Sequence, residues 1–521
     1  MKKYLYLLLA VLLAMPAAAQ EQKTDTTAAD TTVTVKVKKP KRQKKPQEVD
    51  SLGRKIKTGW NFGILPSIAY DADYGFQGGV LTNIYDYGDG KQYPEYIHSI
   101  YVEAAYTTKH HGIFRVNYDS KYLIPGYRLT LDATYLPDAM CDFYGFNGYQ
   151  SRYNASWSSW NKNPAKMDTA SYRTRVFYKY KRDLIRVAGD LEGTIYKDLK
   201  WNAGLGVLGY LVGDCDINMI NGKNHYVDSL PHQKALNPDE PLLYDKYKTW
   251  GLIGANEQNG GWHPYARAGI TYDTRDKRQG PNKGIYTDLF FTYSAAFNAA
   301  YGQQAAAGYN HLQFNFTFRH YVPCFTDKNG INRITFAYRL GVQNLIAGRS
   351  PFYMNNYMNA LFIQRVYYEG LGGGNSVRGM MAHRILANGF AFANIEFRFR
   401  LVNFDIGRQH FFIGLNPFFD LGIVTQPYNL DELVRIHTNG QYQTLAESIN
   451  AANIQYGTDD KYEQYFTTDP KDIYRPHMTA GVGLKIGMNE NFVLSADWGM
   501  PIDRQDNGKL ANFYVKMGYL F

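Results

Sequence analysis

The sequence is poor in cysteine and in long apolar runs, and each shortage excludes a class of protein. Only three cysteines, Cys141, Cys215 and Cys324, occur in 521 residues, which is too few for a disulfide framework. Two interpretations stay open: Cys141 and Cys215 pair if both lie in outer loops, or all three thiols are free. After residue 19 no apolar run reaches the roughly 20 residues that a spanning helix needs. The chain is therefore either a secreted soluble protein or a membrane protein made of strands.

Catalytic motifs are also missing. The sequence contains no H-E-x-x-H, no G-x-S-x-G and no Cys/His cluster with metal-ligand spacing. A membrane-embedded hydrolase would need a Ser/His/acid set near the lipid-facing rim, and none is found. We therefore assign no catalytic residue, no metal ligand and no cofactor, and we do not expect an enzyme.

The N-terminal region has two parts. Residues 1–19 combine a basic start, an apolar run and a small-residue cleavage site at Ala17 to Ala19, which predicts a signal peptide. Residues 20–58 hold eleven Lys and Arg against five Asp and Glu, with almost no large apolar side chain, so a disordered periplasmic tail is expected. Its partner would be anionic lipid, an anionic cell-wall polymer or an acidic periplasmic protein, and a merely solvated tail is the alternative. Nucleic acid is a poor partner for an exported chain.

The chain is rich in the residues that membrane strands use. Tyr occurs 45 times, Phe 29 times and Gly 48 times, and segments of about ten residues alternate apolar and polar side chains from Trp60 onward, as in an outer-membrane barrel. In FANIEFRFRL, Ile395 and Phe397 alternate with Glu396 and Arg398, which suits a wet lumen. The sequence predicts an all-β, transmembrane antiparallel barrel of about sixteen strands over residues 59–521. The expected strands are 59–70, 74–86, 96–108, 112–121, 127–136, 172–195, 199–212, 264–274, 284–296, 308–322, 331–345, 388–401, 409–423, 477–487, 491–500 and 511–521, of which 172–195 could be two.

Long and short connections alternate along this pattern, as outer loops and periplasmic turns do in such barrels. The long ones are about 137–171, 213–263, 346–387 and 424–476, and short ones include 122–126, 275–283, 402–408 and 488–490. This alternation puts the basic tail on the periplasmic side and makes residues 346–387 the sixth outer loop. We expect a Gram-negative outer-membrane location, with outer-membrane lipid around the barrel.

The sixth loop contains the stretch GLGGGNSVRGMMAHRI, residues 370–385. A phosphate-binding P-loop is excluded because no lysine follows the glycines, and the last glycine of a dinucleotide fingerprint would fall on Asn375. The segment GGGNSVRGM resembles instead the sixth-loop signature of the BamA/TamA-type outer-membrane assembly superfamily, also called the bacterial surface antigen family. In that superfamily the loop folds back into the barrel lumen. Val377, Arg378 and Gly379 match the signature, and Met380 replaces the usual aromatic residue.

The resemblance also implies partners for the loop arginine. A guanidinium inside a narrow lumen must be paired, because burying an unpaired charge costs several kcal/mol. Glu396 and Asp420 have the inward-facing parity of neighbouring strands, and the resemblance implies that these carboxylates receive Arg378, whose fork binds carboxylates in a bidentate way. Such a contact between the loop arginine and the wall is compatible with a role in stability alone and with a role in function.

Other stretches resemble the same superfamily in the same order. YDTRDKRQGPNKG (272–284) resembles its turn motif, FYGFNG (143–148) resembles a motif of the surface-antigen branch, and the last strand resembles a signal strand with a kinking glycine, which assembly machinery recognises. In that last strand, the odd-numbered residues from Phe513 to Phe521 are expected to share one outward face. The turn residues are Asp273, Arg275, Asp276, Pro281 and Gly284, and the residues at the seam between the first and last strands are Pro66, Gly518 and Phe521. Pro66 would weaken pairing at the seam, or mark the outer end of the first strand.

The sequence leaves the function open between two classes. Full assembly proteins of this superfamily carry polypeptide-transport-associated domains ahead of the barrel, and residues 20–58 are too few for one. One hypothesis is a barrel that assists protein insertion, translocation or outer-membrane assembly, with a periplasmic partner docked on the tail. The other is a passive channel or structural barrel that has kept only the fold.

Overall fold

A computed structural model of the protein describes residues 56–521, except 94, 160–167, 169–170, 216–240, 278–279, 296–308, 329, 356–369, 407–408 and 489–491. The predicted signal peptide, and the predicted tail up to residue 55, lie outside these described residues. The described chain begins just before the first strand, β1, which starts at Trp60.

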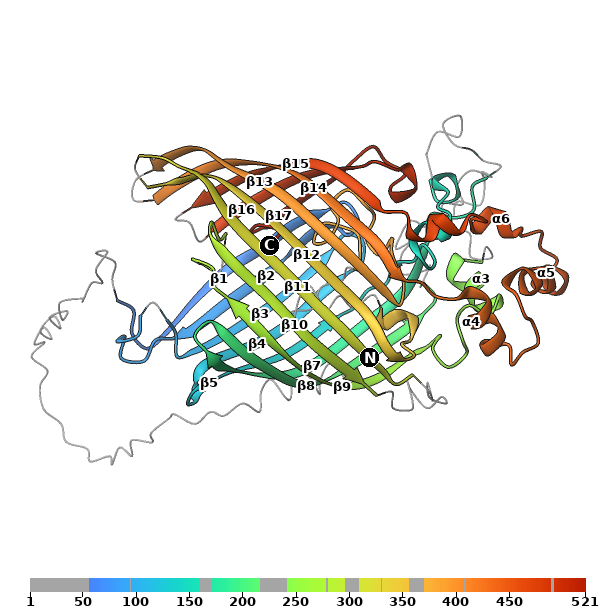
Figure 1. Ribbon diagram of the computed structural model, residues 1–521, viewed down its shortest axis with the longest axis horizontal. Helices are drawn as coiled ribbons and strands as arrows, with labels where there is room; N and C mark the ends of the chain where they lie inside the picture. Colours follow the sequence, from blue (N-terminus) through green and yellow to red (C-terminus); the bar gives the residue numbers. More distant parts are fainter. Residues whose placement is uncertain are drawn as a thin grey trace, which may run out of the picture. The chain divides into compact units, whose positions relative to one another are not determined.

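Sixteen antiparallel strands form a closed barrel, in which each strand pairs with its neighbour in sequence and β1 also pairs with β17 (Figure 1). The two-residue strand β6 (Cys141–Asp142) only adds to β7, and β5 pairs directly with β7. The sixteen are β1 (Trp60–Asp71), β2 (Gly75–Asp86), β3 (His98–Thr107), β4 (Gly112–Ile124), β5 (Tyr127–Leu136), β7 (Lys179–Tyr196), β8 (Leu199–Gly213), β9 (Gly260–Asp273), β10 (Gly284–Ser294), β11 (His311–Thr326), β12 (Asn332–Gly348), β13 (Gly389–Ile406), β14 (Gln409–Gln426), β15 (His477–Met488), β16 (Phe492–Pro501) and β17 (Asn512–Met517). The predicted fold is confirmed, and the ambiguous segment 172–195 supplies one strand.

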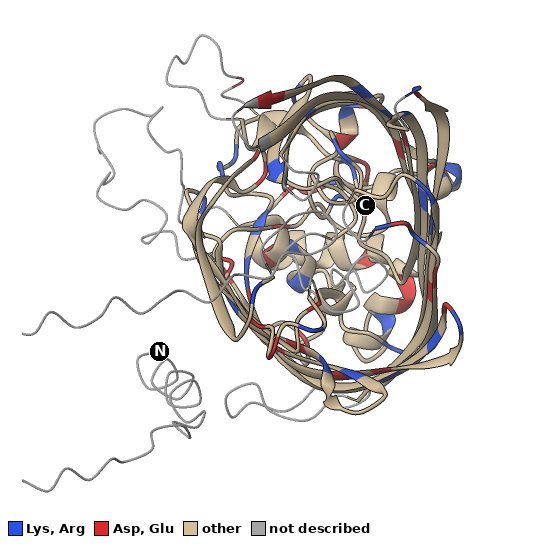
Figure 2. Cartoon of the chain, turned by 90° about the vertical axis from the view of Figure 1, so that its left-hand side faces the viewer, with Lys and Arg blue, Asp and Glu red and all other residues tan. Residues whose placement is uncertain are grey.

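The alternation of side chains explains why these segments are wall strands. On β13, Glu396 is fully buried, whereas its neighbours Ile395 and Phe397 are 38% and 44% exposed. Successive side chains of a strand point to opposite faces, so the polar set faces inward and the apolar set faces outward. Viewed end-on, the ring of strands carries charged residues of both signs (Figure 2).

The long connections meet at one end of the barrel, where the described helices also lie (Figure 1). Helix α5 has the clearest ends: the Thr444 side chain caps it with Glu447, and Gly457 closes it in a left-handed conformation. None of the helices in the described ranges is long or apolar enough to span a membrane. The helices are α3 (Leu243–Thr249), α4 (Leu430–His437), α5 (Leu445–Tyr456) and α6 (Tyr462–Tyr465), and the 3-10 helices are η1 (Gly148–Gln150), η2 (Ala155–Trp157), η4 (Phe352–Met354), η5 (Pro470–Tyr474) and η6 (Arg504–Asp506).

These connections pack into one aromatic core, which we call the outer cap. It includes Phe143, Tyr247, Trp250, Phe352 and Phe466, all buried, and several of the rings meet edge to face. Because its members come from four connections, the cap joins segments that are far apart in the sequence.

All three cysteines are free thiols, with Cys141 and Cys215 buried and Cys324 exposed. Of the two interpretations of Cys141 and Cys215, the structure therefore agrees with unpaired thiols.

Candidate functional site

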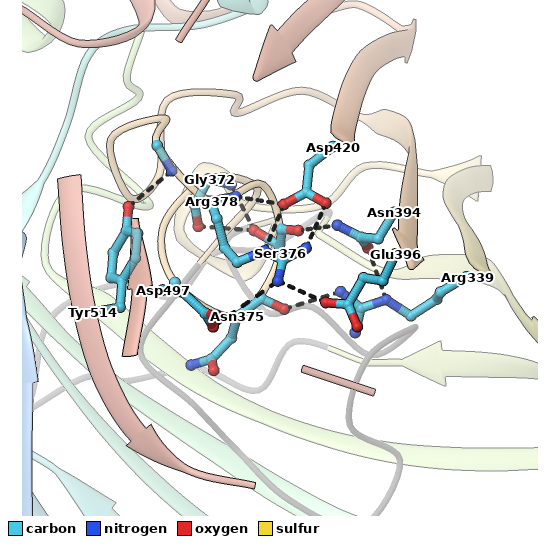
Figure 3. A network of polar contacts seen from close by, with 12 residues as sticks. Arg339, Gly372, Asn375, Ser376, Arg378, Asn394, Glu396, Asp420, Asp497 and Tyr514 are labelled. Carbon is cyan, nitrogen blue, oxygen red and sulfur yellow. Dashed lines mark hydrogen bonds and ion pairs between the residues drawn. The ribbon is translucent and has the colours of Figure 1, made fainter. Parts of the chain in front are cut away.

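The part of the sixth loop that the structure describes before β13, residues 370–388, packs against the inner face of the wall. Leu371, Val377, Met380 and Ile385 are buried and form a small apolar cluster with Phe390, Phe392 and Val424 of β13 and β14. Polar groups of the loop contact charged and polar residues of the wall (Figure 3).

Arg378 is the centre of these polar contacts (Figure 3). Its Nε and Nη2 donate to Oδ2 and Oδ1 of Asp420 at 2.8 and 2.9 Å, and its Nη1 donates to Oε1 of Glu396 at 2.6 Å. All three side chains are fully buried. The guanidinium also lies 3.5 Å from the ring centroid of Phe418. Arg378 thus contacts both carboxylates that the sequence singled out, with the bidentate geometry on Asp420.

The electrostatics favour the charged arginine. Burial alone would lower the pKa of Arg378, but the negative charges of Asp420 and Glu396 outweigh it and raise that pKa above its ordinary value. Glu396 has a second cation, because Nε of Arg398 donates to its Oε2 at 2.9 Å. Asp497, which receives Lys485, lies 3.9 Å from Arg378 Nη1. The buried charges therefore form one compensated network, as burial requires.

A second layer holds the loop backbone in place. Asn394 Nδ2 donates to the carbonyl of Ser376 at 2.6 Å, and Arg339 donates to Asn394 Oδ1 at 2.9 Å and to the carbonyl of Asn375 at 3.2 Å. Ser376 bonds within the loop, to the backbone of Gly372. Arg339 and Asn394 were not singled out from the sequence, although both have inward-facing parity.

Gly379 is required by a close approach. Its φ is +98°, and a Cβ there would lie 2.7 Å from the carbonyl carbon of Gly499 on β16. No other residue type fits such a contact with backbone without displacing it. The sequence signature therefore includes Gly379 because the loop backbone crosses directly over β16.

The loop also contacts both strands of the barrel's closing seam. On the β17 side, Gly379 N donates to Tyr514 Oη at 3.1 Å and Lys516 Nζ donates to Asn375 Oδ1 at 3.2 Å. On the β1 side, Ala382 N donates to Asp73 Oδ2 at 3.3 Å in the turn between β1 and β2. Burial, together with the charge of nearby Asp71, raises the pKa of Asp73 to about 8. One loop thus bridges the first and last strands.

The seam itself is sparsely paired. β1 and β17 share two residue pairs, Tyr70 with Val515 and Asp71 with Tyr514, whereas β1 pairs with β2 along all twelve of its residues. Pro66 lies inside β1 rather than at its outer end, opposite Val80 of β2 and outside the part that pairs with β17. The edge of β1 from Trp60 to Ala69 has no partner strand among the described residues.

β17 is short because the chain turns inward after it. Gly518 has φ +91°, a left-handed conformation that reverses the strand alternation. Beyond it, Phe521 packs on Tyr321 and Ala337, is only 8% exposed, and accepts a hydrogen bond from Arg398 Nη2 on its backbone oxygen at 2.8 Å. The expectation that Phe521 shares the outward face of Phe513 is therefore wrong, because the alternation does not continue through Gly518.

The predicted turn residues come together between β9 and β10. Arg275 donates from Nε and Nη2 to the two carboxylate oxygens of Asp273, both at 2.8 Å, and Asp276 Oδ1 accepts from the backbone of Asn282 at 3.0 Å. Gly284 has φ +107°. Pro281 lines a hollow at this end of the barrel. These contacts stabilise the turn between β9 and β10. The turn is distant in sequence from the sixth loop.

A second polar cluster was missed from the sequence. His477 Nδ1 lies 2.5 Å from Asp506 Oδ1, and the imidazole stacks on Tyr149 with ring centroids 3.7 Å apart. Arg384 donates to the carbonyls of Gln505, Gly148 and Ser151. Burial would raise the pKa of Asp506, but the charge and hydrogen bond of His477, together with Arg384, lower it. The only sequence signal was Arg384 itself, a second arginine six residues after Arg378.

The FYGFNG stretch, residues 143–148, contributes further hydrogen bonds to the outer cap. Asn147 exchanges hydrogen bonds with the backbone of Tyr428, at 2.8 Å from its Nδ2 and at 2.7 Å to its Oδ1, and its own N–H donates to the carbonyl of Leu386 at 2.8 Å. This motif therefore connects three long connections, including the sixth loop.

Across the described ranges, no group of three or more His, Cys, Asp or Glu side chains could hold a metal ion. The buried charges around Arg378 are paired with each other, so this arrangement fixes the loop to the barrel wall.

A closed antiparallel barrel with an apolar outer face and a charged interior defines an outer-membrane β-barrel protein. The Omp85 superfamily domain matches residues 117–521, and the chain belongs to that superfamily. Its described residues contain no polypeptide-transport-associated domain. No curated protein is similar enough in sequence to match the chain.

Solved structures with a similar barrel include two kinds of protein. BamA from Haemophilus ducreyi lacking POTRA domains 1-3 has 13% identity and a TM-score of 0.47, with 89% of this chain and 71% of that chain covered. CdiB from Escherichia coli has 11% identity and a TM-score of 0.46, with 87% and 62% covered. CdiB from Acinetobacter baumannii has 12% identity and a TM-score of 0.41, with 89% and 60% covered. The chain thus spans less than two thirds of the length of both CdiB chains.

Proposed function

We propose that the protein assists the insertion, translocation or assembly of other proteins at the outer membrane by opening between β1 and β17. The observation that carries this proposal is the seam of two residue pairs, next to a β1 edge that has no partner strand from Trp60 to Ala69 among the described residues. Unpaired backbone groups cost several kcal/mol each in lipid. An extended segment from a client protein would satisfy them by adding a strand to that edge.

The surroundings of the edge support the same proposal. The outward residues Phe62, Ile64 and Ile68 of β1 are 77%, 65% and 55% exposed, so the edge adjoins lipid on its outer side. Gly63 and Leu65 on the inward side of β1 are exposed as well. A client strand could therefore approach β1 from the interior and leave it toward the membrane.

Two further proposals concern the remaining parts of the chain. We propose that residues 1–19 direct export and that residues 20–58 lie on the periplasmic side, where their positive charge attracts an acidic partner protein or an anionic polymer. The protein would act without chemistry of its own. A passive channel is the second candidate, but the aromatic packing of the outer cap favours a closed outer end.

A disulfide across the seam tests the proposal. Tyr70 and Val515 are opposite each other in the ladder and both face outward, so cysteines at these positions can be oxidised to lock the seam. The matched control locks Ile486 to Leu494, an outward pair in the continuous ladder between β15 and β16. Both variants carry Ser at the exposed Cys324.

We expect the Tyr70→Cys/Val515→Cys variant to lose function on oxidation and recover with reductant, while the control pair stays active in both states. The readouts are cell growth and the amount of folded outer-membrane barrels. Full activity of the locked, correctly inserted seam variant would rule out opening between β1 and β17 and leave the passive or structural barrel.

A further inference from the structure

The edge of β1 that has no partner strand among the described residues, Trp60 to Ala69, is called the free edge below, and it contains a proline. Pro66 lies opposite Val80 of β2, and β1 pairs with β2 along all twelve of its residues without a register shift. A proline has no backbone N–H, so inside a sheet its nitrogen faces away from the paired neighbour. The uninterrupted ladder with β2 therefore indicates that the nitrogen of Pro66 points toward the free edge.

Hydrogen bonds between β1 and β2 give the same direction. Gly59, directly before β1, donates from its N–H to the carbonyl of Gly88 at 2.8 Å and accepts from the N–H of Tyr87 at 3.0 Å. Successive residues of an antiparallel strand direct their N–H and C=O groups to alternate sides, so the odd-numbered residues of β1 face β2 and the even-numbered residues face the free edge. Thr82 Oγ1 of β2 donates to the carbonyl of Gly63 at 3.1 Å, in agreement. The free edge thus offers the N–H groups of Trp60, Phe62, Ile64 and Ile68, with a gap between the last two.

The last strand carries an interruption at the same level of the seam. Tyr70 pairs with Val515, and this register, continued by four residues on each strand, places Tyr519 opposite Pro66. One residue earlier, Gly518 has φ +91° and turns the chain inward. Both strands therefore have a residue that breaks a ladder at neighbouring pairs, where the pairing of β1 with β17 would otherwise continue.

Continued pairing would strand a backbone group. If β17 ran on past Gly518 in an extended conformation, the carbonyl of Tyr519 would face Pro66 and receive no N–H from it. An unsatisfied backbone group at membrane depth costs several kcal/mol. In the structure Tyr519 has left the ladder, and its ring centroid lies 4.5 Å from the guanidinium carbon of Arg398.

We propose that Pro66 is a stop that prevents β17 from pairing along the free edge, and that it thereby keeps Trp60–Ile64 available to the incoming strand of a client protein. The second half of this proposal rests on the proposed function, whereas the first half does not. Both faces of the segment are open, because Phe62 and Ile64 are 77% and 65% exposed on the outward side and a Cβ on Gly63 would meet no atom within 4 Å on the inward side. A client strand therefore pairs first with the end at which β1 begins.

Supplying the missing N–H tests the proposal. The variant is Pro66→Ala, in the full chain reconstituted in lipid vesicles. The matched control is Pro417→Ala, which changes a proline of β14 that lies opposite Val482 of β15, away from the seam. Hydrogen exchange of the β1 amides between Trp60 and Ala69 is the first readout. The second is the rate of disulfide formation in Ile68→Cys/Met517→Cys, a pair that follows the seam pairs in register and is 55% and 44% exposed.

We expect Pro66→Ala to slow the exchange of these β1 amides by about two- to tenfold, the effect of one added hydrogen bond, and to speed the disulfide. Pro417→Ala should change neither. In cells, Pro66→Ala should also lower the amount of folded outer-membrane barrels.

The outcomes separate the two halves of the proposal. Slower exchange with undiminished assembly of other barrels would retain Pro66 as the stop and reject the use of the free edge by clients. Unchanged exchange and unchanged disulfide formation in a correctly inserted Pro66→Ala variant would overturn the stop itself.

Discussion

The wall around β13 and β14 and the seam between β1 and β17 represent opposite extremes of the same barrel. β13 and β14 are each 18 residues long and share fifteen residue pairs, whereas β1 and β17 share two. Both regions contact the sixth loop, through Arg378 in the first case and through Tyr514 and Asp73 in the second. The difference indicates that the loop is anchored on a continuously paired part of the wall and bridges the two sides of the sparsely paired seam through side-chain contacts.

The largest expected effect comes from removing the anchor. Arg378→Ala removes the cation that Asp420 receives and leaves Glu396 with Arg398 alone, which should lower the free energy of unfolding by about 3–5 kcal/mol. Urea unfolding in lipid vesicles measures it. Arg333→Ala, which breaks a partly exposed pair with Asp327, serves as the control and should cost less than about 1 kcal/mol.

A second variant separates charge from shape at the anchor. Adding Asp420→Asn to Arg378→Ala removes one of the stranded charges and should recover part of the lost stability, as a coupled pair does. Additive losses in the double variant would show that the Arg378–Asp420 pair contributes no coupling.

The next largest effect is expected where the loop crosses β16, because a change there should affect both the wall and the seam. Gly379→Ala should lower the free energy of unfolding by about 2 kcal/mol or more, because the new Cβ combines a left-handed φ with a 2.7 Å contact on the Gly499 backbone. The seam should loosen too, since Gly379 N–H donates to Tyr514. Hydrogen exchange of the β17 amides, compared with those of β13, measures that loosening. Gly440 has φ +79° and open space around it, so Gly440→Ala controls for backbone strain alone. Unchanged hydrogen exchange of the β17 amides in Gly379→Ala would show that the loop does not stabilise the seam.

The anchored wall was far easier to predict from sequence than the seam. Alternation along each strand places Glu396 and Asp420 inward. The resemblance of the loop to the superfamily signature then implied that these two carboxylates receive Arg378. The partners of Arg384, by contrast, come from the segments around Gly148 and Gln505, and no local pattern links such distant connections.

The length of the seam ladder could not be predicted, because the last strand ends at a backbone conformation that its sequence permits but does not require. The apolar alternation of β17 continues in the sequence through Tyr519 and Phe521, and only the left-handed φ of Gly518 ends the strand. Glycine permits that angle without requiring it. Sequence reasoning therefore identified Gly518 as a kink but placed Phe521 on the wrong face.

The smallest expected effect on stability comes from changing Gly518, and it tests what limits the pairing of β1 with β17. Gly518→Ala meets no atom within 4 Å, so only the left-handed φ of +91° opposes the new side chain; that conformation costs an alanine about 1–2 kcal/mol. If the end of β17 relaxes to an extended conformation, Met517 and the residues after it can pair with the free edge of β1. We expect oxidation of the Tyr70→Cys/Val515→Cys pair to become faster in the Gly518→Ala background, and the exchange of β1 amides between Trp60 and Ala69 to slow. Faster exchange there would mean that the inward turn of residues 519–521 supports the seam instead of limiting it.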